Sequence, residues 1–200
     1  MPLHPVRCGW ARREPEIAYH DTEWGLPQHD DCLLFELLTL EGAQAGLSWE
    51  TVLRKRAGYR AAFEGFDPAV VAGFDAARID ALVADARIVR HRGKIRATVS
   101  NAGAFLAVQH EHGSFDAYLW GFVDGQPIVT HRPEGESLPA RTDLSDRVSA
   151  ALKARGFTFV GSTVVYAYLQ ATGVVDDHAA ACFRARQGAN ASCILDTRVS

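Results

Sequence analysis

The chain has 200 residues, 48% of them apolar, and a formal net charge of −3 at pH 7. This length and apolar content are enough for a packed core, which excludes a wholly disordered chain. No apolar run approaches the length of a bilayer span, and no signal-peptide pattern follows Arg7, Arg12 and Arg13, so we expect a cytoplasmic protein with no membrane association.

Helical spacing of apolar residues dominates the first third of the chain. Apolar side chains recur at this spacing over 31–40, with Asp30 or Asp31 as the N-cap, and Ser48 is the expected cap of the next helix. Between the two helices lies EGAQAG at 41–46, whose glycines predict an interruption and not a continued helix.

The middle of the chain continues the pattern with clear start signals. Asp67 followed by Pro68 predicts a cap and a first helical residue, and Asp75 stands before another periodic run. A long helix is expected over 90–109, and a short helix begins at Ser114. A proline-rich loop follows.

The last third predicts two helices joined by a glycine-bounded turn, at about 145–173. Gly156 and Gly161 allow the backbone to turn tightly. Ser162 and Thr163 begin the second helix, and the free N–H groups at a helix start form a site for a phosphate. Such a turn grips a DNA backbone without reading its sequence, although most helical hairpins bind nothing.

Apolar residues inside this turn are expected to point into the core; they are Phe157, Phe159 and Val160. Period-two alternation occurs only in short, ambiguous runs, and the chain contains no repeat and no separating linker. We therefore predict an all-α fold and one structural unit over 1–200.

A basic stretch, RIVRHRGKIR at 87–96, contains five Lys/Arg and one His. A local patch of this kind is compatible with nucleic-acid phosphates despite the negative net charge. It is equally the pattern of a solvated helix face, and composition alone favours that second interpretation.

Two pairs of soft metal ligands stand at opposite ends of the chain. Cys8 and His20 form one pair; His178 and Cys182, four residues apart, share a face if their segment is helical. Two cysteines and two histidines form the closed tetrahedral coordination of structural zinc, so one zinc ion could join the chain ends. The first spacing is no zinc-finger signature, and plain burial is the alternative.

The other two cysteines, Cys32 and Cys193, have no histidine at a comparable spacing. We assign Cys32 to the core and Cys193 to a flexible tail at 186–200. Disulfides are not expected in a reducing cytosol.

Five motifs, in unbroken order, resemble the 3-methyladenine DNA glycosylase I family, a zinc-bearing branch of the helix-hairpin-helix DNA glycosylases. They are RCGW with IAYHDTEWG, LEGAQAGLSWETVLRKR, RHRGKI, RGFTFVG, and DDH with the following Cys, and they cover essentially residues 7–185. The resemblance implies two interleaved helical lobes and a zinc clasp between 8–20 and 178–182. Its implied ligands are Cys8, His20, His178 and Cys182.

The resemblance also implies a pocket into which the damaged base is flipped. The matching residues are Glu41, Tyr19 and Trp49, with Trp10 and Trp24 nearby. A 3-methyladenine nucleotide is a delocalised cation, which electron-rich rings bind through cation–π attraction and which a carboxylate attracts directly. The alternatives are core filling for the aromatics and a solvated loop carboxylate for Glu41.

The activity implied is that of a monofunctional base-excision glycosylase, monomeric and acting on double-stranded alkylated DNA. Because the base leaves as a neutral molecule, the enzyme mainly binds, orients and stabilises an oxocarbenium-like sugar. Thr163 stands where lyase relatives carry a lysine, so no Schiff base is expected. Asp176 stands at the superfamily's catalytic carboxylate; a helix-capping or backbone role is the interpretation that we favour.

Gln44 and Leu47 are the candidates for filling the hole left in the duplex, although Leu47 also fits a hydrophobic staple on the following helix.

Two other classes of protein would explain part of these features. A non-catalytic, zinc-stapled DNA-binding module explains the hairpin but not Glu41 beside Tyr19 and Trp49. A zinc hydrolase is disfavoured, because four protein ligands leave no position for water.

Overall fold

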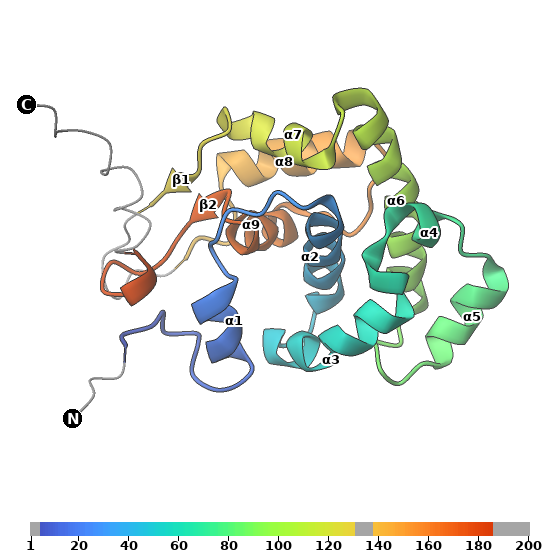
Figure 1. The fold of residues 1–200 in the computed structure, drawn as a ribbon, viewed down its shortest axis with the longest axis horizontal. Coiled ribbons are helices and arrows are strands. Elements are labelled where there is room, and N and C mark those ends of the chain that lie inside the picture. Colours follow the sequence, from blue (N-terminus) through green and yellow to red (C-terminus); the bar gives the residue numbers. More distant parts are fainter. Residues whose placement is uncertain (1–4, 131–137, 186–200) are drawn as a thin grey trace, which may run out of the picture.

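The structure, a computed structural model, describes residues 5–130 and 138–185 (Figure 1). The predicted tail at 186–200, with Cys193, lies outside the described residues. The elements are α1 (Glu16–Thr22), α2 (Asp31–Gln44), α3 (Trp49–Ala62), η1 (Glu64–Phe66), α4 (Pro68–Ala72), α5 (Ala76–Ala84), α6 (Arg92–His112), α7 (Phe115–Trp120), η2 (Gly121–Val123), β1 (Ile128–Val129), α8 (Asp143–Ala154), α9 (Ser162–Ala171) and β2 (Val175–Asp176).

The predicted helix starts are confirmed by their caps. In each case a side-chain oxygen accepts a hydrogen bond from a backbone N–H two or three residues later; the capping residues are Asp30, Ser48, Asp67, Asp75 and Ser114. Helix α6 begins slightly later than expected, because the His91 ring accepts from the Lys94 N–H at 3.1 Å. Local capping chemistry thus fixes where these helices begin.

Helix α2 is the centre of the molecule. It lies between α9 on one side and α3 and α6 on the other, and every residue from 34 to 43 is buried (Figure 1). The buried side chains of the described chain form one core that reaches from Cys8 to Ala185. A residue near the end of α2 is therefore surrounded by protein on several sides.

The interruption predicted at EGAQAG begins later than expected, because α2 continues to Gln44 and only Ala45 and Gly46 of this stretch lie in the turn before α3. Gly42 lies against the hairpin turn, where an added Cβ would be in ordinary contact with the Phe159 backbone oxygen at 3.5 Å. The Lys94 ammonium donates to the carbonyls of Ala43 and Ala45 at 2.8 and 2.7 Å. Tertiary contacts therefore hold this glycine-containing turn in the helix, against its weak intrinsic preference.

The predicted pair of helices is present as α8 and α9, which pack on each other, with Gly156 in the turn at φ +88°. Phe157 and Val160 are buried as expected, but Phe159 is 41% exposed, so its predicted burial is wrong. Its backbone is left-handed, at φ +57°, and directs the ring toward His91, with 6.3 Å between ring centroids.

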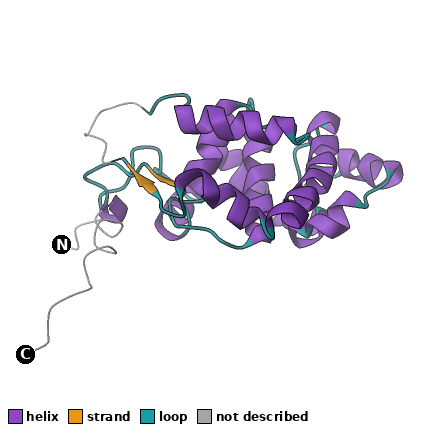
Figure 2. Ribbon diagram, turned by 90° about the horizontal axis from the view of Figure 1, so that it is seen from above, coloured by secondary structure: helices purple, strands orange, loops and turns teal. Residues whose placement is uncertain are grey.

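Strands β1 and β2 form one short parallel pair in a mainly helical molecule (Figure 2). Ile128 pairs with Val175 and Val129 with Asp176. The predominantly helical prediction is confirmed, with this pair as an addition. It holds the segment after α9 in place beside the loop after α7.

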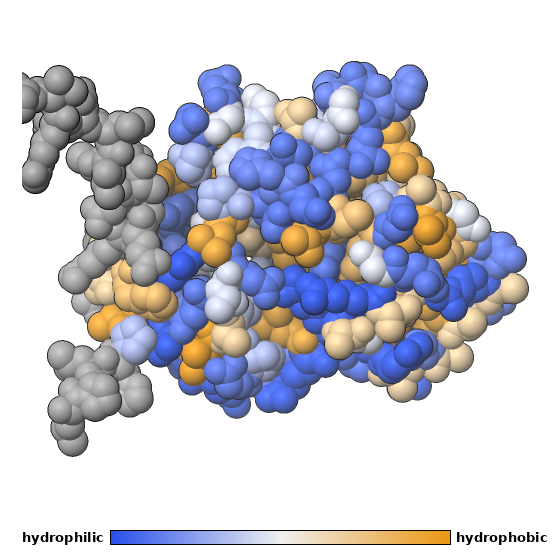
Figure 3. All heavy atoms as spheres, viewed as in Figure 1, coloured by the Kyte–Doolittle hydropathy of each residue, from blue (hydrophilic) through white to orange (hydrophobic). Residues whose placement is uncertain are grey.

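The face of the molecule in Figure 3 is mostly hydrophilic, with apolar residues in small separate patches.

Cys32 is exposed at the start of α2, so its assignment to the core is wrong. Within the described ranges, no helix combines the length and apolar character needed to traverse a bilayer.

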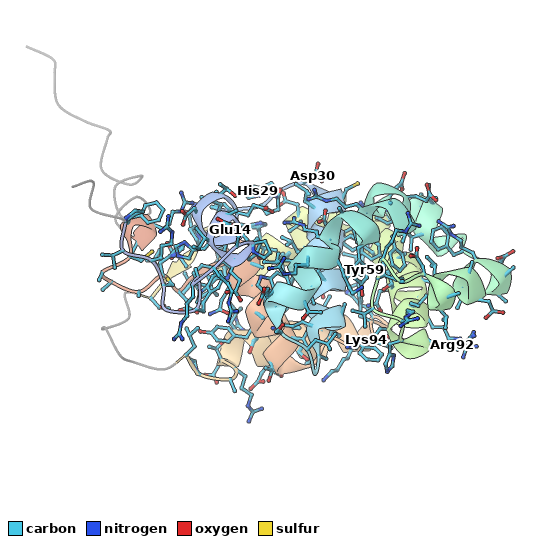
Figure 4. The ribbon with its side chains drawn as sticks, turned by 90° about the horizontal axis from the view of Figure 1, so that it is seen from below. Glu14, His29, Asp30, Tyr59, Arg92 and Lys94 are labelled. Atoms are coloured by element: carbon cyan, nitrogen blue, oxygen red, sulfur yellow. The ribbon has the colours of Figure 1, made fainter. Side chains whose placement is uncertain are left out.

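Three of the five cations in the basic stretch 87–96 are paired within the protein. Arg87 bridges Asp85 at 2.8 Å, Arg92 bridges Asp80 at 2.5 Å, and Lys94 caps α2 as described above. Figure 4 shows Arg92 and Lys94 at the start of α6. This pairing favours the interpretation as a solvated helix face over a dedicated phosphate patch.

Candidate active site and metal cluster

A cavity of about 260 Å³ lies between α1, α2, α3 and α9. All five predicted base-pocket residues line it, namely Trp10, Tyr19, Trp24, Glu41 and Trp49. The other lining residues are Glu16, Gln44, Leu138, Ala167 and Gln170. Residues from separate parts of the chain thus converge on one hollow; we call it the base pocket.

The aromatic side chains form a connected wall. Tyr19 and Trp49 have ring centroids 5.3 Å apart, Trp10 and Trp24 are edge-to-face at 5.1 Å, and Trp10 lies 6.3 Å from Tyr19. The faces of aromatic rings carry negative charge density, so a wall of this composition suits a flat cationic ligand.

Glu41 is a buried carboxyl, 5% exposed, in the last turn of α2. Among the described residues its Oε2 has no hydrogen-bond partner, and neither does the Tyr19 hydroxyl. Burial raises the pKa of Glu41 to about 8 and raises the pKa of Tyr19 well above its ordinary value. Unpartnered buried groups are costly, so the pair is suited to a ligand that supplies the missing partners.

A paired charge network lies behind Tyr19. The Arg56 guanidinium bridges Glu23 at 2.7 Å and also bonds Glu36, which in turn accepts from Arg60 at 2.9 Å. The Arg56 guanidinium lies 6.0 Å from the centre of the Tyr19 ring. The network connects α1, α2 and α3 and thereby supports the position of Tyr19.

A second cavity, of about 300 Å³, adjoins the base pocket and shares Glu41 and Gln44 with it. Leu47, which is 41% exposed, and Thr163 also line it, so three of the predicted DNA-contacting residues lie together. Gly161 precedes α9, and no side chain caps that helix start. The backbone N–H groups of Ser162 and Thr163, at the start of α9, are therefore left available for a ligand.

The four predicted metal ligands, Cys8, His20, His178 and Cys182, form one buried cluster with all ligand atoms within 4.8 Å of one another. Cys8 Sγ lies 3.5 Å from His178 Nδ1, and Cys182 Sγ lies 3.4 Å from His20 Nε2. Ligands about 2.0–2.3 Å from a tetrahedral ion stand about 3.3–3.8 Å apart. The donor atoms therefore fit a metal ion.

Further contacts orient these ligands. Asp21 holds His20 Nδ1 at 2.8 Å, and the Trp24 carbonyl holds His178 Nε2 at 3.2 Å, so each ring turns its other nitrogen toward the cluster. Hydrogen bonds from Cys8 and from the two histidines lower the pKa of the Cys182 thiol. A thiolate is the form that binds metals.

The expectation that His178 and Cys182 share a helical face is wrong. The chain leaves β2 and forms turns over residues 179–182, with Cys182 N bonded to Ala179 O at 2.7 Å. Asp176, in β2, accepts from the His178 N–H at 3.1 Å and does not line the base pocket. Asp176 therefore bonds the backbone of a non-helical segment, since residues 177 and 178 are not in a helix.

The Cys2His2 cluster (Cys8, His20, His178 and Cys182) and the base pocket share a wall. The Trp24 ring is edge-to-face with His178 at 4.6 Å, and the Trp10 ring is edge-to-face with His20 at 5.4 Å. Both tryptophans also line the base pocket. A loss of order in the cluster would therefore displace the two tryptophans that line the pocket.

We expect Gly25→Ala to lower the free energy of unfolding by about 2–4 kcal/mol and to weaken metal retention. Gly25 has φ +77°, and an added Cβ would lie 2.7 Å from His178 Nε2. Gly113→Ala is the matched control, because Gly113 has φ +86° with open space around it. Urea unfolding and metal analysis measure both effects, and equal losses in the two variants would contradict the clash.

Gln170, which lines the base pocket from α9, was not among the residues predicted from the sequence. The available signal was a glutamine in the otherwise apolar run at 164–171. A buried glutamine needs hydrogen-bond partners, and those partners lie outside its own helix.

A sequence profile of the methyladenine glycosylase family matches residues 10–185. The chain is 50% identical over 177 residues to DNA-3-methyladenine glycosylase 1 of Escherichia coli K12, an alignment that covers 88% of this chain and 95% of the relative. The DNA-3-methyladenine glycosylase of Haemophilus influenzae is 47% identical over 178 residues, covering 88% and 96%.

Solved structures agree with these relatives. A crystal structure of 3-methyladenine DNA glycosylase I superposes with a TM-score of 0.86 at 49% identity, covering 89% of this chain and 98% of the other. A variant of such an enzyme in complex with 3-methyladenine superposes with a TM-score of 0.85 at 36% identity, covering 88% and 96%. The chain therefore belongs to the methyladenine glycosylase family.

Proposed function

We propose that the protein is a DNA glycosylase of base excision repair that hydrolyses the N-glycosidic bond of 3-methyladenine in alkylated double-stranded DNA. The products are the free base and an abasic site. The observation that carries this proposal is the convergence of the unpartnered Glu41 with Tyr19 and Trp49 on one pocket. The relative that was solved with 3-methyladenine supports the choice of base.

Recognition in this proposal rests on the charge of the lesion. N3-methylation makes the adenine cationic, so it gains cation–π attraction from Tyr19 and Trp49 that neutral adenine lacks. Glu41, once ionised, attracts the same charge in a site from which most water is excluded. Trp10 and Trp24 complete the wall. The damaged base must be flipped out of the helix to enter the pocket.

The chemistry needs little acid catalysis, because the base leaves as a neutral molecule. The enzyme orients the nucleotide, the developing positive charge on the sugar is stabilised, and water attacks C1′. Among the described residues, no lysine lines either cavity, and Thr163 stands at the rim. A monofunctional enzyme without Schiff-base chemistry follows.

DNA is held, in this proposal, by a helix-hairpin-helix formed by α8, the turn and α9. Gly156 permits the turn, and the free N–H groups of Gly161, Ser162 and Thr163 at the start of α9 face a phosphate. Gln44 and Leu47, beside Thr163, are placed to occupy the space left by the flipped nucleotide.

We assign zinc, one ion per chain, to the cluster of Cys8, His20, His178 and Cys182. When bound, the ion supplies a structural crosslink between the ends of the fold, and its four protein ligands leave no position for a reactive water. This closed shell disfavours a zinc hydrolase.

Three further properties of the protein stay predictions: one structural unit, a monomeric state and a cytoplasmic location.

The test is incubation of the protein with DNA methylated in vitro, followed by chromatographic analysis of released bases. We expect 3-methyladenine in the supernatant and alkali-labile abasic sites in the DNA. DNA binding with no base release would favour the non-catalytic binding module instead. Strand cleavage without alkali would contradict the monofunctional assignment.

Asp176→Asn is expected to leave the rate of 3-methyladenine release within about threefold of the wild type, because Asp176 holds the His178 N–H and an asparagine oxygen can do the same. Single-turnover measurements separate the chemical step from binding. A loss of about 100-fold or more in that step would instead identify Asp176 as a catalytic carboxylate.

A further inference from the structure

We propose that Gln170 contacts the substrate: its side-chain amide oxygen, fixed in orientation by Asp177, accepts a hydrogen bond from the exocyclic amine of the flipped adenine and disfavours guanine. This inference rests on the proposed function and extends it. It adds a second acceptor to Glu41.

Gln170 is 6% exposed and lines the base pocket together with Glu41. Its side-chain Nε2 donates at 2.7 Å to Oδ2 of Asp177, a residue that does not line the pocket. Its backbone carbonyl accepts from Gly25 N at 3.1 Å. Both the main chain and the amide nitrogen of Gln170 are therefore held in place.

The Asp177 carboxylate determines which way this amide faces. Asp177 is 3% exposed and also accepts hydrogen bonds from the hydroxyls of Thr130 and Tyr166. Gln170 Nε2 is the third donor to this carboxylate, beside the two hydroxyls, so the NH₂ group of Gln170 faces Asp177. The amide oxygen is then left over, and the described residues offer it no hydrogen bond.

Glu41 and Gln170 can together pair both hydrogens of the lesion's exocyclic amine. An N3-methylated adenine nucleotide carries N–H hydrogens only on its exocyclic amine, which has two. Among the described residues, Glu41 Oε2 has no hydrogen-bond partner, and Gln170 lines the same pocket with its amide nitrogen already bonded to Asp177 and its amide oxygen left over. In a methylated guanine a carbonyl oxygen replaces the amine and would face these acceptors, which leaves buried groups unpaired.

A second glutamine in the chain, Gln109, also donates its amide nitrogen to an aspartate, but it lies outside the base pocket. Gln109, on α6, donates its amide nitrogen to Asp31 Oδ2 at 2.6 Å and does not line the base pocket. Gln109→Met is therefore a matched control for the loss of a glutamine–aspartate hydrogen bond. Gln170→Met is the test variant, because methionine has a similar length and no amide.

The experiment uses two free bases, 3-methyladenine and 3-methylhypoxanthine, in which a carbonyl replaces the amine. Tryptophan fluorescence titration gives the ratio of their dissociation constants for the wild type and both variants. We expect Gln170→Met to reduce the preference for 3-methyladenine about tenfold, and Gln109→Met to leave it unchanged. An unchanged ratio in Gln170→Met overturns the inference.

A crystal structure of the wild type with 3-methyladenine provides a measurement that does not depend on a variant folding. We expect the Gln170 amide oxygen within about 3.2 Å of the exocyclic nitrogen. A longer separation, or an amide turned around, overturns the inference. Release of 3-methyladenine from methylated DNA by the wild type tests the proposed function separately. If no 3-methyladenine is released, the proposed function and the inference about Gln170 both fail.

Discussion

Replacing Glu41 with glutamine is expected to lower kcat/KM for 3-methyladenine release about 100-fold or more, and to make the protein more resistant to urea. The variant loses the charge that opposes the cationic lesion in a site where water does not screen it. It also removes a buried carboxyl whose Oε2 has no partner among the described residues, and such burial is unfavourable to the fold. Activity and stability should therefore move in opposite directions.

The pH dependence of this effect follows from the pKa of Glu41, which burial raises to about 8 from an ordinary 4.5. The folded protein keeps a proton that the unfolded chain releases, so the contribution of Glu41 to stability is lost as the pH rises from 4.5 to 8. The stability gained in Glu41→Gln should grow across that window and then become constant. Because recognition needs the ionised form, the kcat/KM of the wild type should rise toward pH 8.

Urea unfolding and single-turnover assays between pH 5 and pH 9 measure both trends. Glu64→Gln is the control, since Glu64 is an exposed carboxylate paired with Arg78 at 2.8 Å and lies outside the base pocket. A Glu41→Gln enzyme that keeps the wild-type rate would contradict the proposed role of the carboxylate.

Removing the proposed zinc ion is the second change with a large expected effect. Cys182→Ser, or a strong chelator, should lower the free energy of unfolding by several kcal/mol, since structural zinc binding in small domains is worth about 10–16 kcal/mol and part of it is folding energy. Base release should fall as well, because Trp10 and Trp24 contact the histidines of the cluster and line the base pocket.

Metal analysis, thermal unfolding and tryptophan fluorescence report on this prediction together. Cys32→Ser is the matched control, because Cys32 is exposed and lies outside the cluster. We expect the control to keep one equivalent of zinc and the wild-type melting temperature. If Cys182→Ser melted at the wild-type temperature, the cluster would not be a structural crosslink.

Much of the fold was predictable because its signals are local. A cap such as Ser48 or Asp75 bonds a backbone N–H only three residues away, so the sequence window contains both partners. The aromatic and glutamate residues of the base pocket were also predicted, but through resemblance to a family, because no spacing rule connects Tyr19 with Glu41 and Trp49.

Other features depend on partners that are distant in the sequence. Helix α2 continues through Gly42 because Lys94 bonds the carbonyls at its end, 51 residues away in the case of Ala43. His178 and Cys182 meet in turns held by Cys8, 171 residues from Ala179, and not on a helix. A pattern confined to neighbouring residues does not contain this information.

The sequence by itself determined the helix starts and the ligand types of the Cys2His2 cluster, because these depend on contacts within one helical turn and on residue identity. The tertiary structure alone decided that the Oε2 atom of Glu41 is buried without a partner among the described residues, and that Asp177 holds the amide nitrogen of Gln170. Burial and desolvation are set by atoms from α1, α3 and α9 together, so they exist only once the chain has folded.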